Sequence, residues 1–183
     1  NKMILADKYY IENLNKIKNE GYWDKNPRAK YKDGTPAFSK YITGVFETYD
    51  ISKGEFPIPT LRNTAIKTGI KEIQWIYQLQ SNKLEDAHKL GVNWWDEWNI
   101  GDDTIGNRYG YIIKKYNLVG KLLSGLISNP FDRGHIINMH QYSDLESSLG
   151  LRHCAYETLW SVRLSEDGKI TYLDMTLIQR SND

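Results

Sequence analysis

The clearest structural signal in this sequence is a pair of strand-like segments close to its C-terminal end. Residues 154–162 and 169–180 are rich in β-branched and aromatic residues, and the loop between them ends in Asp167-Gly168. An Asp-Gly pair between two such segments predicts a β-hairpin. In the second segment one face would carry Ile170, Tyr172 and Ile178, and the other Leu173, Met175 and Leu177. Because both faces carry apolar residues, we expect 169–180 to be an interior strand.

The spacing of apolar residues predicts several helices and two more strands. Within residues 62–79, apolar side chains recur at intervals of four, three and four and would form one helix face, namely Ile66, Ile70, Ile73 and Tyr77. Further helices are predicted over 4–20, 84–90 and 118–128, and strand character over 37–50 and 135–140. The chain therefore combines helices with a few strands.

Length and charge limit the classes of protein that this chain can belong to. Its 183 residues suit one domain over 1–183 with a sizeable core. Lys and Arg number 24 against 23 Asp and Glu, so we expect neither nucleic-acid nor membrane binding. A single cysteine and no expected signal peptide suit a reducing cytoplasm. The chain begins with Asn1 and stops directly after a strand-like segment, so we expect a fragment.

The single cysteine, Cys154, lies among arginine-containing stretches that together predict a site. Arg133 ends the stretch 129–133, and Arg180-Ser181 belong to the stretch 179–183. Arginines can hold a phosphate and also favour a thiolate nearby, which would then attack a substrate. The alternative is that Cys154 is a small buried apolar residue. The four histidines do not have the spacing of metal ligands, so no metal site is predicted.

Two further features each allow a structural and a functional interpretation. Glu72 lies one position before Ile73, beside the apolar face of the predicted helix, where a carboxylate is usually a solvated flank. Three tryptophans occur within residues 94–98. They can be part of the hydrophobic core, or they can form a flat aromatic wall for a planar ligand.

Several motifs, in this order, make the sequence similar to the thymidylate synthase family along essentially its whole length. They are Phe56-Pro57-Ile58-Pro59-Thr60, Lys71-Glu72-Ile73-Gln74-Trp75, Trp95-Asp96-Glu97-Trp98, Arg108-Tyr109-Gly110 and Gln179-Arg180-Ser181-Asn182-Asp183. The surroundings of Cys154 resemble the branch of the family found in bacilli and phages. The resemblance implies an α/β (α+β) fold, a mixed sheet flanked by helices, in a homodimer.

The resemblance also implies a role for each matching residue. Cys154 would attack carbon 6 of the uracil ring, Glu72 would move protons through ordered water, and Tyr109 would place a hydroxyl near the ring. The nucleotide phosphate would be held by Arg28, Arg180 and Ser181, and by Arg133 of the neighbouring subunit. Folate would contact Trp95, Trp98 and Asp183.

The implied reaction is the reductive methylation of dUMP to dTMP, with 5,10-methylenetetrahydrofolate as co-substrate. Two alternatives stay open at this point. A relative that makes hydroxymethylated pyrimidine nucleotides from dUMP or dCMP would share the same residues, and a non-catalytic nucleotide-binding relative would keep the fold. The chain departs from the family pattern at Gly134, where a second arginine is usual, and at His153, where a proline is usual.

Overall fold

The structure is a computed structural model that describes residues 2–182. The chain consists of two compact units, Asn1–Ala65 and Ile66–Asp183, and each is described here by itself. The single domain over 1–183 therefore stays a prediction. Helices and antiparallel strands are both present, so the chain belongs to the predicted α+β class.

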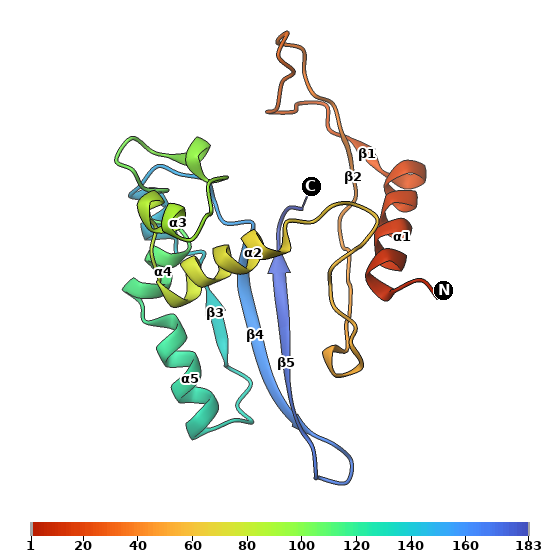
Figure 1. Ribbon diagram of the computed structural model, residues 1–183, viewed down its shortest axis with the longest axis vertical. Coiled ribbons are helices and arrows are strands. Elements are labelled where there is room, and N and C mark those ends of the chain that lie inside the picture. The colour runs from red at the N-terminus through yellow and green to blue at the C-terminus, as the bar shows by residue number, and fades with distance from the viewer. Residues whose placement is uncertain (1, 183) are drawn as a thin grey trace. The chain divides into compact units, whose positions relative to one another are not determined.

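The first unit contains one long helix and a very short sheet (Figure 1). Helix α1 (Leu5–Glu20) matches the predicted 4–20, and strand β1 (Tyr22–Trp23) pairs antiparallel with β2 (Lys40–Tyr41). The only other regular element among its described residues is the 3-10 helix η1 (Ile51–Lys53). Most of the strand predicted over 37–50 is absent there. Gly44 lies at φ 71°, in the left-handed region, which interrupts an extended backbone.

The second unit holds the remaining helices (Figure 1). Helix α2 (Ile66–Ile73) continues as a π-helical turn η2 (Gln74–Gln78), so the predicted 62–79 begins four residues too early. After it come α3 (Leu84–Lys89), the 3-10 helix η3 (Asp96–Trp98), α4 (Gly110–Lys115), α5 (Leu118–Ser128) and α6 (Tyr142–Glu146). Helices α3 and α5 confirm the predictions over 84–90 and 118–128.

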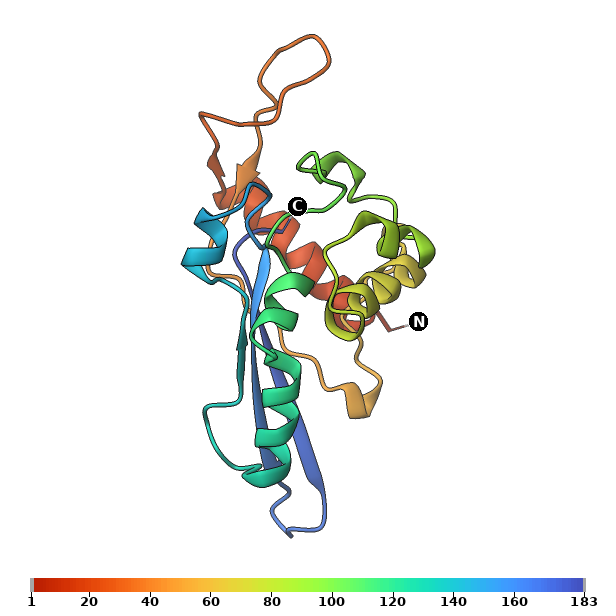
Figure 2. The same ribbon diagram turned by 90° about the vertical axis from the view of Figure 1, so that its left-hand side faces the viewer.

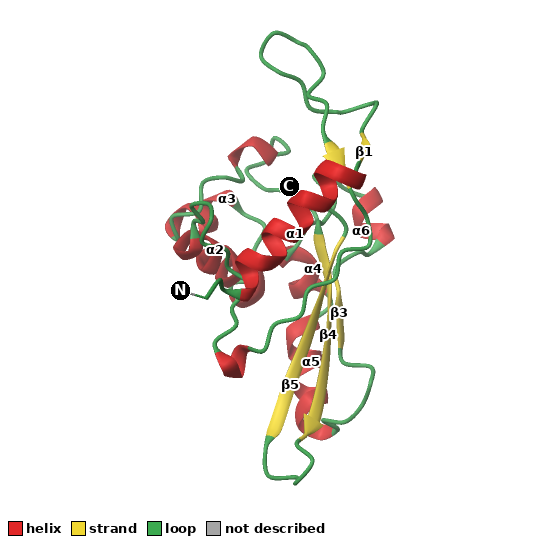
Figure 3. Cartoon of the chain, turned by 90° about the vertical axis from the view of Figure 1, so that its right-hand side faces the viewer, coloured by secondary structure: helices red, strands yellow, loops and turns green. Residues whose placement is uncertain are grey.

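A three-stranded antiparallel sheet forms the other half of this unit (Figure 3). Its order is β3 (Ile136–Asn138), β4 (Ala155–Leu164) and β5 (Thr171–Gln179). The predicted hairpin is confirmed, because β4 and β5 pair along their whole length. The prediction of an interior second strand is wrong for the described sheet, where β5 lies at the edge. Apolar residues on both faces do not determine how many strands pair with a strand, and Leu173, Met175 and Leu177 of β5 are 47–54% exposed in the described structure.

The core of the second unit lies between the helices and one face of the sheet (Figure 2). Trp75 from η2, Ile112 and Ile113 from α4, and Ile137 from β3 are each at most 1% exposed. The core therefore joins α2–η2 and α4 to the start of the sheet. Glu72, Tyr109 and Cys154 belong to segments that are anchored in it.

Candidate active site

Cys154 lies directly before β4, opposite the end of β5. The backbone N–H of Arg180 donates to the Cys154 carbonyl at 2.9 Å, which continues the ladder of the hairpin by one more bond. The Arg180 guanidinium also donates from Nε to the His153 carbonyl and from Nη2 to the Arg152 carbonyl, both at 2.8 Å. Arg180 thus binds the backbone of the segment that contains the half-buried Cys154, and the predicted effect of an arginine on the thiol stays a prediction.

Tyr109 fixes the segment around Cys154 from the other side. Its hydroxyl accepts the backbone N–H of Cys154 at 2.9 Å, and its own backbone N–H donates to Nε2 of His153 at 2.7 Å. The two rings pack edge to face with centroids 4.5 Å apart. Tyr109 has a φ of 46°, a strained value for a residue with a Cβ, which only a well-packed site maintains. Burial raises the pKa of Tyr109 to about 12, so its hydroxyl keeps its proton at neutral pH.

His153 is a neutral, fully buried histidine. Its side chain is 0% exposed, and because Nε2 accepts a hydrogen bond, the ring proton lies on Nδ1. Nδ1 has no hydrogen-bond partner among the described residues. Burial is the main cause that lowers the pKa of His153 to about 3, and the neighbouring charges of Arg108, His140 and Arg180 contribute to the same shift. The residue that replaces the usual proline therefore acts as an acceptor for Tyr109.

We expect His153 to make the stability of this chain depend on pH. Between pH 6.5 and about 3 the unfolded chain binds a proton at this residue and the folded chain does not. Stability should therefore decrease as the pH falls through this window, by about 2 kcal/mol at pH 5. Urea unfolding at pH 7 and pH 5 measures this loss.

The matched variant for this measurement is His153→Gln, because glutamine can still accept the Tyr109 N–H and does not titrate. The aspartates whose pKa values are lowered, such as Asp144, lose their contribution only below about pH 4, outside the measured interval. Equal losses of stability in the wild type and in His153→Gln would show that His153 is not held neutral.

Glu72, on α2, is half-buried and accepts two indole N–H groups. Trp95 Nε1 donates to its Oε2 at 2.7 Å, and Trp94 Nε1 donates to the same oxygen. The interpretation of Glu72 as a merely solvated flank is therefore wrong. The contact of Trp95 was not predicted, and Trp94 was not predicted as a site residue at all. The signal in the sequence that could have indicated this contact is the group of three tryptophans within residues 94–98, each of which carries an indole N–H donor.

Trp95 connects Glu72 to the residues around Cys154. Its ring packs edge to face against Tyr109 with centroids 5.5 Å apart, and it also contacts Trp75 at 6.2 Å. Trp95 and Trp98 thus belong at least partly to the core, as one of the two interpretations of residues 94–98 predicted, and the wall for a planar ligand stays a prediction. Trp98, in η3, is half-buried and packs against the same core.

Arg108 holds the segment that leads into Cys154. Its side chain is 3% exposed and donates to the backbone carbonyls of Leu151, Asn107, Leu145, Ser148 and Gly150 at 2.9–3.3 Å. An arginine that donates to five backbone carbonyls fixes the conformation of the backbone around it. Its place in the sequence motif is thereby explained by the fold.

The remaining predicted residues are less closely linked to Cys154. Ser181 follows β5 and is exposed, and Arg133 is exposed in the turn between α5 and β3. Arg28 belongs to the first unit, between β1 and β2, and Asp183 lies outside the described residues. The structure therefore brings together Cys154, Tyr109, Arg180, Trp95 and Glu72. The roles predicted for all of these residues stay predictions.

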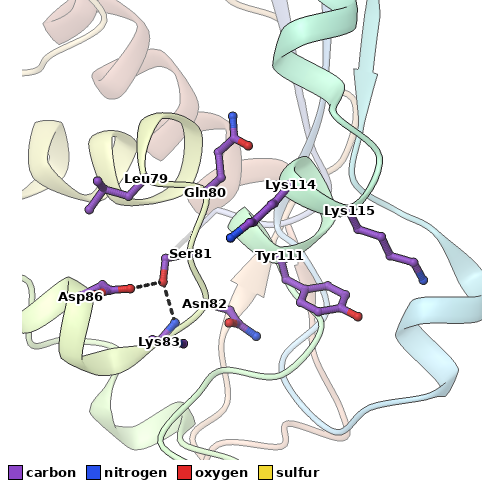
Figure 4. A pocket seen from close by; sticks show the side chains of 9 residues that line it. All are labelled: Leu79, Gln80, Ser81, Asn82, Lys83, Asp86, Tyr111, Lys114 and Lys115. Atoms are coloured by element: carbon purple, nitrogen blue, oxygen red, sulfur yellow. Dashed lines mark hydrogen bonds between the residues drawn. The ribbon is translucent and has the colours of Figure 1, made fainter.

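A separate hollow of about 390 Å³ lies between η2, α3 and α4 (Figure 4). In it, Ser81 donates to Asp86 at 2.6 Å and accepts the backbone N–H of Lys83 at 3.0 Å. None of the predicted site residues lines this hollow. Within residues 2–182, no three His, Cys, Asp or Glu side chains gather as metal ligands would.

The fold and the site together define an α+β protein with one half-buried cysteine, whose backbone segment is bound by an arginine and by a tyrosine that packs against the indole bound to a carboxylate. The family model for thymidylate synthase matches residues 8–183. The chain therefore belongs to the thymidylate synthase family.

Individual relatives agree with this assignment. The chain is 55% identical to thymidylate synthase of Lactococcus lactis subsp. lactis over 182 residues, and 52% identical to that of Streptococcus sanguinis over 183 residues. It covers 65% of the length of each, and each alignment includes 99% of this chain. The structure of thermostable thymidylate synthase A from Bacillus subtilis matches 97% of this chain with a TM-score of 0.83 and 33% identity, and 65% of that chain is covered.

Proposed function

We propose that this protein catalyses the reductive methylation of dUMP to dTMP, with 5,10-methylenetetrahydrofolate as the source of both carbon and hydride. The observation that carries the proposal is the placement of Cys154, the only cysteine in the sequence. It lies at the open end of the β4–β5 hairpin, where its backbone N–H donates to the Tyr109 hydroxyl and the Arg180 guanidinium donates to the carbonyl of the adjacent His153. Family membership supports the same chemistry.

In the proposed reaction, the Cys154 thiolate forms a bond to carbon 6 of the electron-poor uracil ring. The electron pair of the ring double bond moves to carbon 5, which captures the methylene group of the folate. Loss of the carbon 5 proton and departure of the folate nitrogen leave an exocyclic methylene group on the ring. A hydride from the tetrahydrofolate reduces this group to methyl while the bond to Cys154 breaks, which releases dTMP, dihydrofolate and the free thiolate. The Tyr109 hydroxyl, whose raised pKa keeps it protonated, accepts the backbone N–H of Cys154. Glu72 exchanges protons with the ring and with the leaving folate nitrogen through ordered water.

The nucleotide phosphate is assigned to Arg180 and Ser181, with Arg28 and the Arg133 of a partner subunit. Only two N–H groups of the Arg180 guanidinium are used by the backbone carbonyls described above, and a guanidinium has five. The others can bind phosphate oxygens. The folate is assigned to Trp95 and Trp98, which expose part of their indole surfaces, and to Asp183.

Two measurements on the full-length protein test the proposal. Product analysis after incubation with dUMP should show a methyl group on carbon 5 and dihydrofolate. A hydroxymethyl product with tetrahydrofolate would instead identify the hydroxymethylating relative. A covalent complex with fluoro-dUMP and folate, seen by mass spectrometry, should form on Cys154. If nucleotide binds but neither product nor covalent complex forms, the protein is a non-catalytic binding relative.

We further infer a cytoplasmic homodimer in which Arg133 acts in the site of the partner subunit. Two observations support it: Arg133 is exposed, and no hydrogen bond or ion pair joins its guanidinium to the described part of the chain. A cytoplasmic location fits the single cysteine. No described helix is both long enough and apolar enough to cross a membrane.

Subunit mixing tests the role of Arg133. Arg133→Ala alone should weaken nucleotide binding by about 10- to 100-fold, as expected for a lost charge-assisted hydrogen bond. Mixed with inactive Cys154→Ser, it should recover about a quarter of wild-type activity, because each hybrid dimer contains one intact site. The matched control mixes Cys154→Ser with Cys154→Ala, which cannot restore a site. Hybrid dimers that form without regaining activity would contradict a role in trans.

A further inference from the structure

The two indole N–H groups on Glu72 come from adjacent residues, Trp94 and Trp95. On a strand, adjacent side chains point to opposite faces, so they could not reach one atom. Here both lie in a turn directly before η3, with Trp95 at φ −91° and ψ −2°. This backbone conformation is what brings two large donors to the same carboxylate oxygen.

The two donors contact only one side of the carboxylate. Oε2 accepts both indole N–H groups, whereas none of the hydrogen bonds among the described residues reaches Oε1. A carboxylate held by one donor can rotate about its last carbon–carbon bond and exchange its two oxygens. Two donors that approach Oε2 from different residues oppose this rotation. Oε1 is thereby kept free to accept or donate a proton.

We propose that Trp94 is a positioning residue: together with Trp95 it holds Glu72 by Oε2 and directs Oε1 toward the reacting groups. This inference rests on the proposed function. Trp95 is half-buried and packs against the core, whereas Trp94 is 47% exposed. The Glu72 contact is therefore what distinguishes Trp94 from an ordinary surface tryptophan.

The hydrogen bonds can be measured without any turnover, on this chain labelled with ¹⁵N in its tryptophans. The six tryptophans should give six indole N–H signals. Trp94→Phe and Trp95→Phe each remove one signal and thereby assign it. In Glu72→Gln the charged acceptor becomes a neutral, weaker one, so both assigned proton signals should move upfield.

Glu85→Gln is the matched control, because Glu85 is an exposed carboxylate that pairs with Lys89 at 2.8 Å. It should leave both assigned signals in place, and Glu72→Gln should leave the signal of the exposed Trp23 in place. A Trp94 signal that does not respond to Glu72→Gln would overturn the proposal.

Turnover of the full-length protein then tests the positioning role. Trp94→Phe should reduce kcat by about tenfold and change the KM for nucleotide by less than about twofold, because the lost bond is charge-assisted but partly replaceable by water. In the Glu72→Gln background, Trp94→Phe should cause no further loss. A merely structural role would instead reduce activity by the same factor in both backgrounds, and that result would refute the inference. If the wild type shows no turnover, the proposed function fails, and the two indole signals still decide whether the double contact exists.

Discussion

Cys154→Ser is expected to abolish turnover of dUMP in the full-length protein. A serine hydroxyl is a far weaker nucleophile than a thiolate at neutral pH, and loss of a catalytic nucleophile costs on the order of 10⁴- to 10⁶-fold. The local structure should persist, because the Tyr109 hydroxyl binds the backbone N–H of residue 154 and Arg180 binds backbone carbonyls. Both contacts are independent of the side chain.

Steady-state assays give the loss of turnover, and calorimetric titration with dUMP gives the affinity. We expect nucleotide affinity to remain within a few-fold of wild type, because Arg180 and Ser181 are unchanged. Cys154→Ala serves as the control that has no nucleophile at all, and it should be equally inactive. Wild-type turnover by the serine variant would remove Cys154 from the mechanism.

The second large effect is expected for Glu72→Gln. Glutamine keeps the shape of the side chain and can still accept the indole N–H groups through its carbonyl oxygen, but it cannot carry a proton. Turnover should fall by about 10²- to 10⁴-fold, the usual loss when acid–base catalysis is removed. The affinity for dUMP should be close to wild type, because Glu72 contacts indoles and no phosphate-binding residue.

Glu85→Gln again provides the control for removing one negative charge, and it should retain full activity. Covalent-complex formation with fluoro-dUMP gives an additional readout of the early step, which should be affected less than complete turnover. If Glu72→Gln turns over within a few-fold of wild type, Glu72 only anchors the two tryptophans.

The elements that the sequence predicted well are those governed by local interactions. The Asp167-Gly168 turn and the alternation of residues on either side of it determine the β4–β5 hairpin. That hairpin alone accounts for the neighbourhood of Cys154 and Arg180, since the backbone bond between them continues the ladder. The apolar periodicity of α1 and α5 is equally local, and both helices lie where it predicts.

The contacts of Glu72, Tyr109 and His153 could not be predicted in the same way. Glu72 and Trp95 are 23 residues apart, and Tyr109 lies 44 residues before His153 and 45 before Cys154. Local propensity carries no information about such pairs, because their geometry depends on how the core around Trp75 and Ile112 packs. The strained φ of Tyr109 is likewise imposed by that packing.

The sequence by itself thus determined the hairpin and the principal helices, because each follows from turn chemistry and periodicity. The tertiary structure decided that β5 is an edge strand of the described sheet, that two adjacent indoles hold one carboxylate oxygen, and that a neutral histidine takes the place of a proline before Cys154. These features depend on how segments distant in the sequence pack against one another, which local turn chemistry and periodicity do not specify.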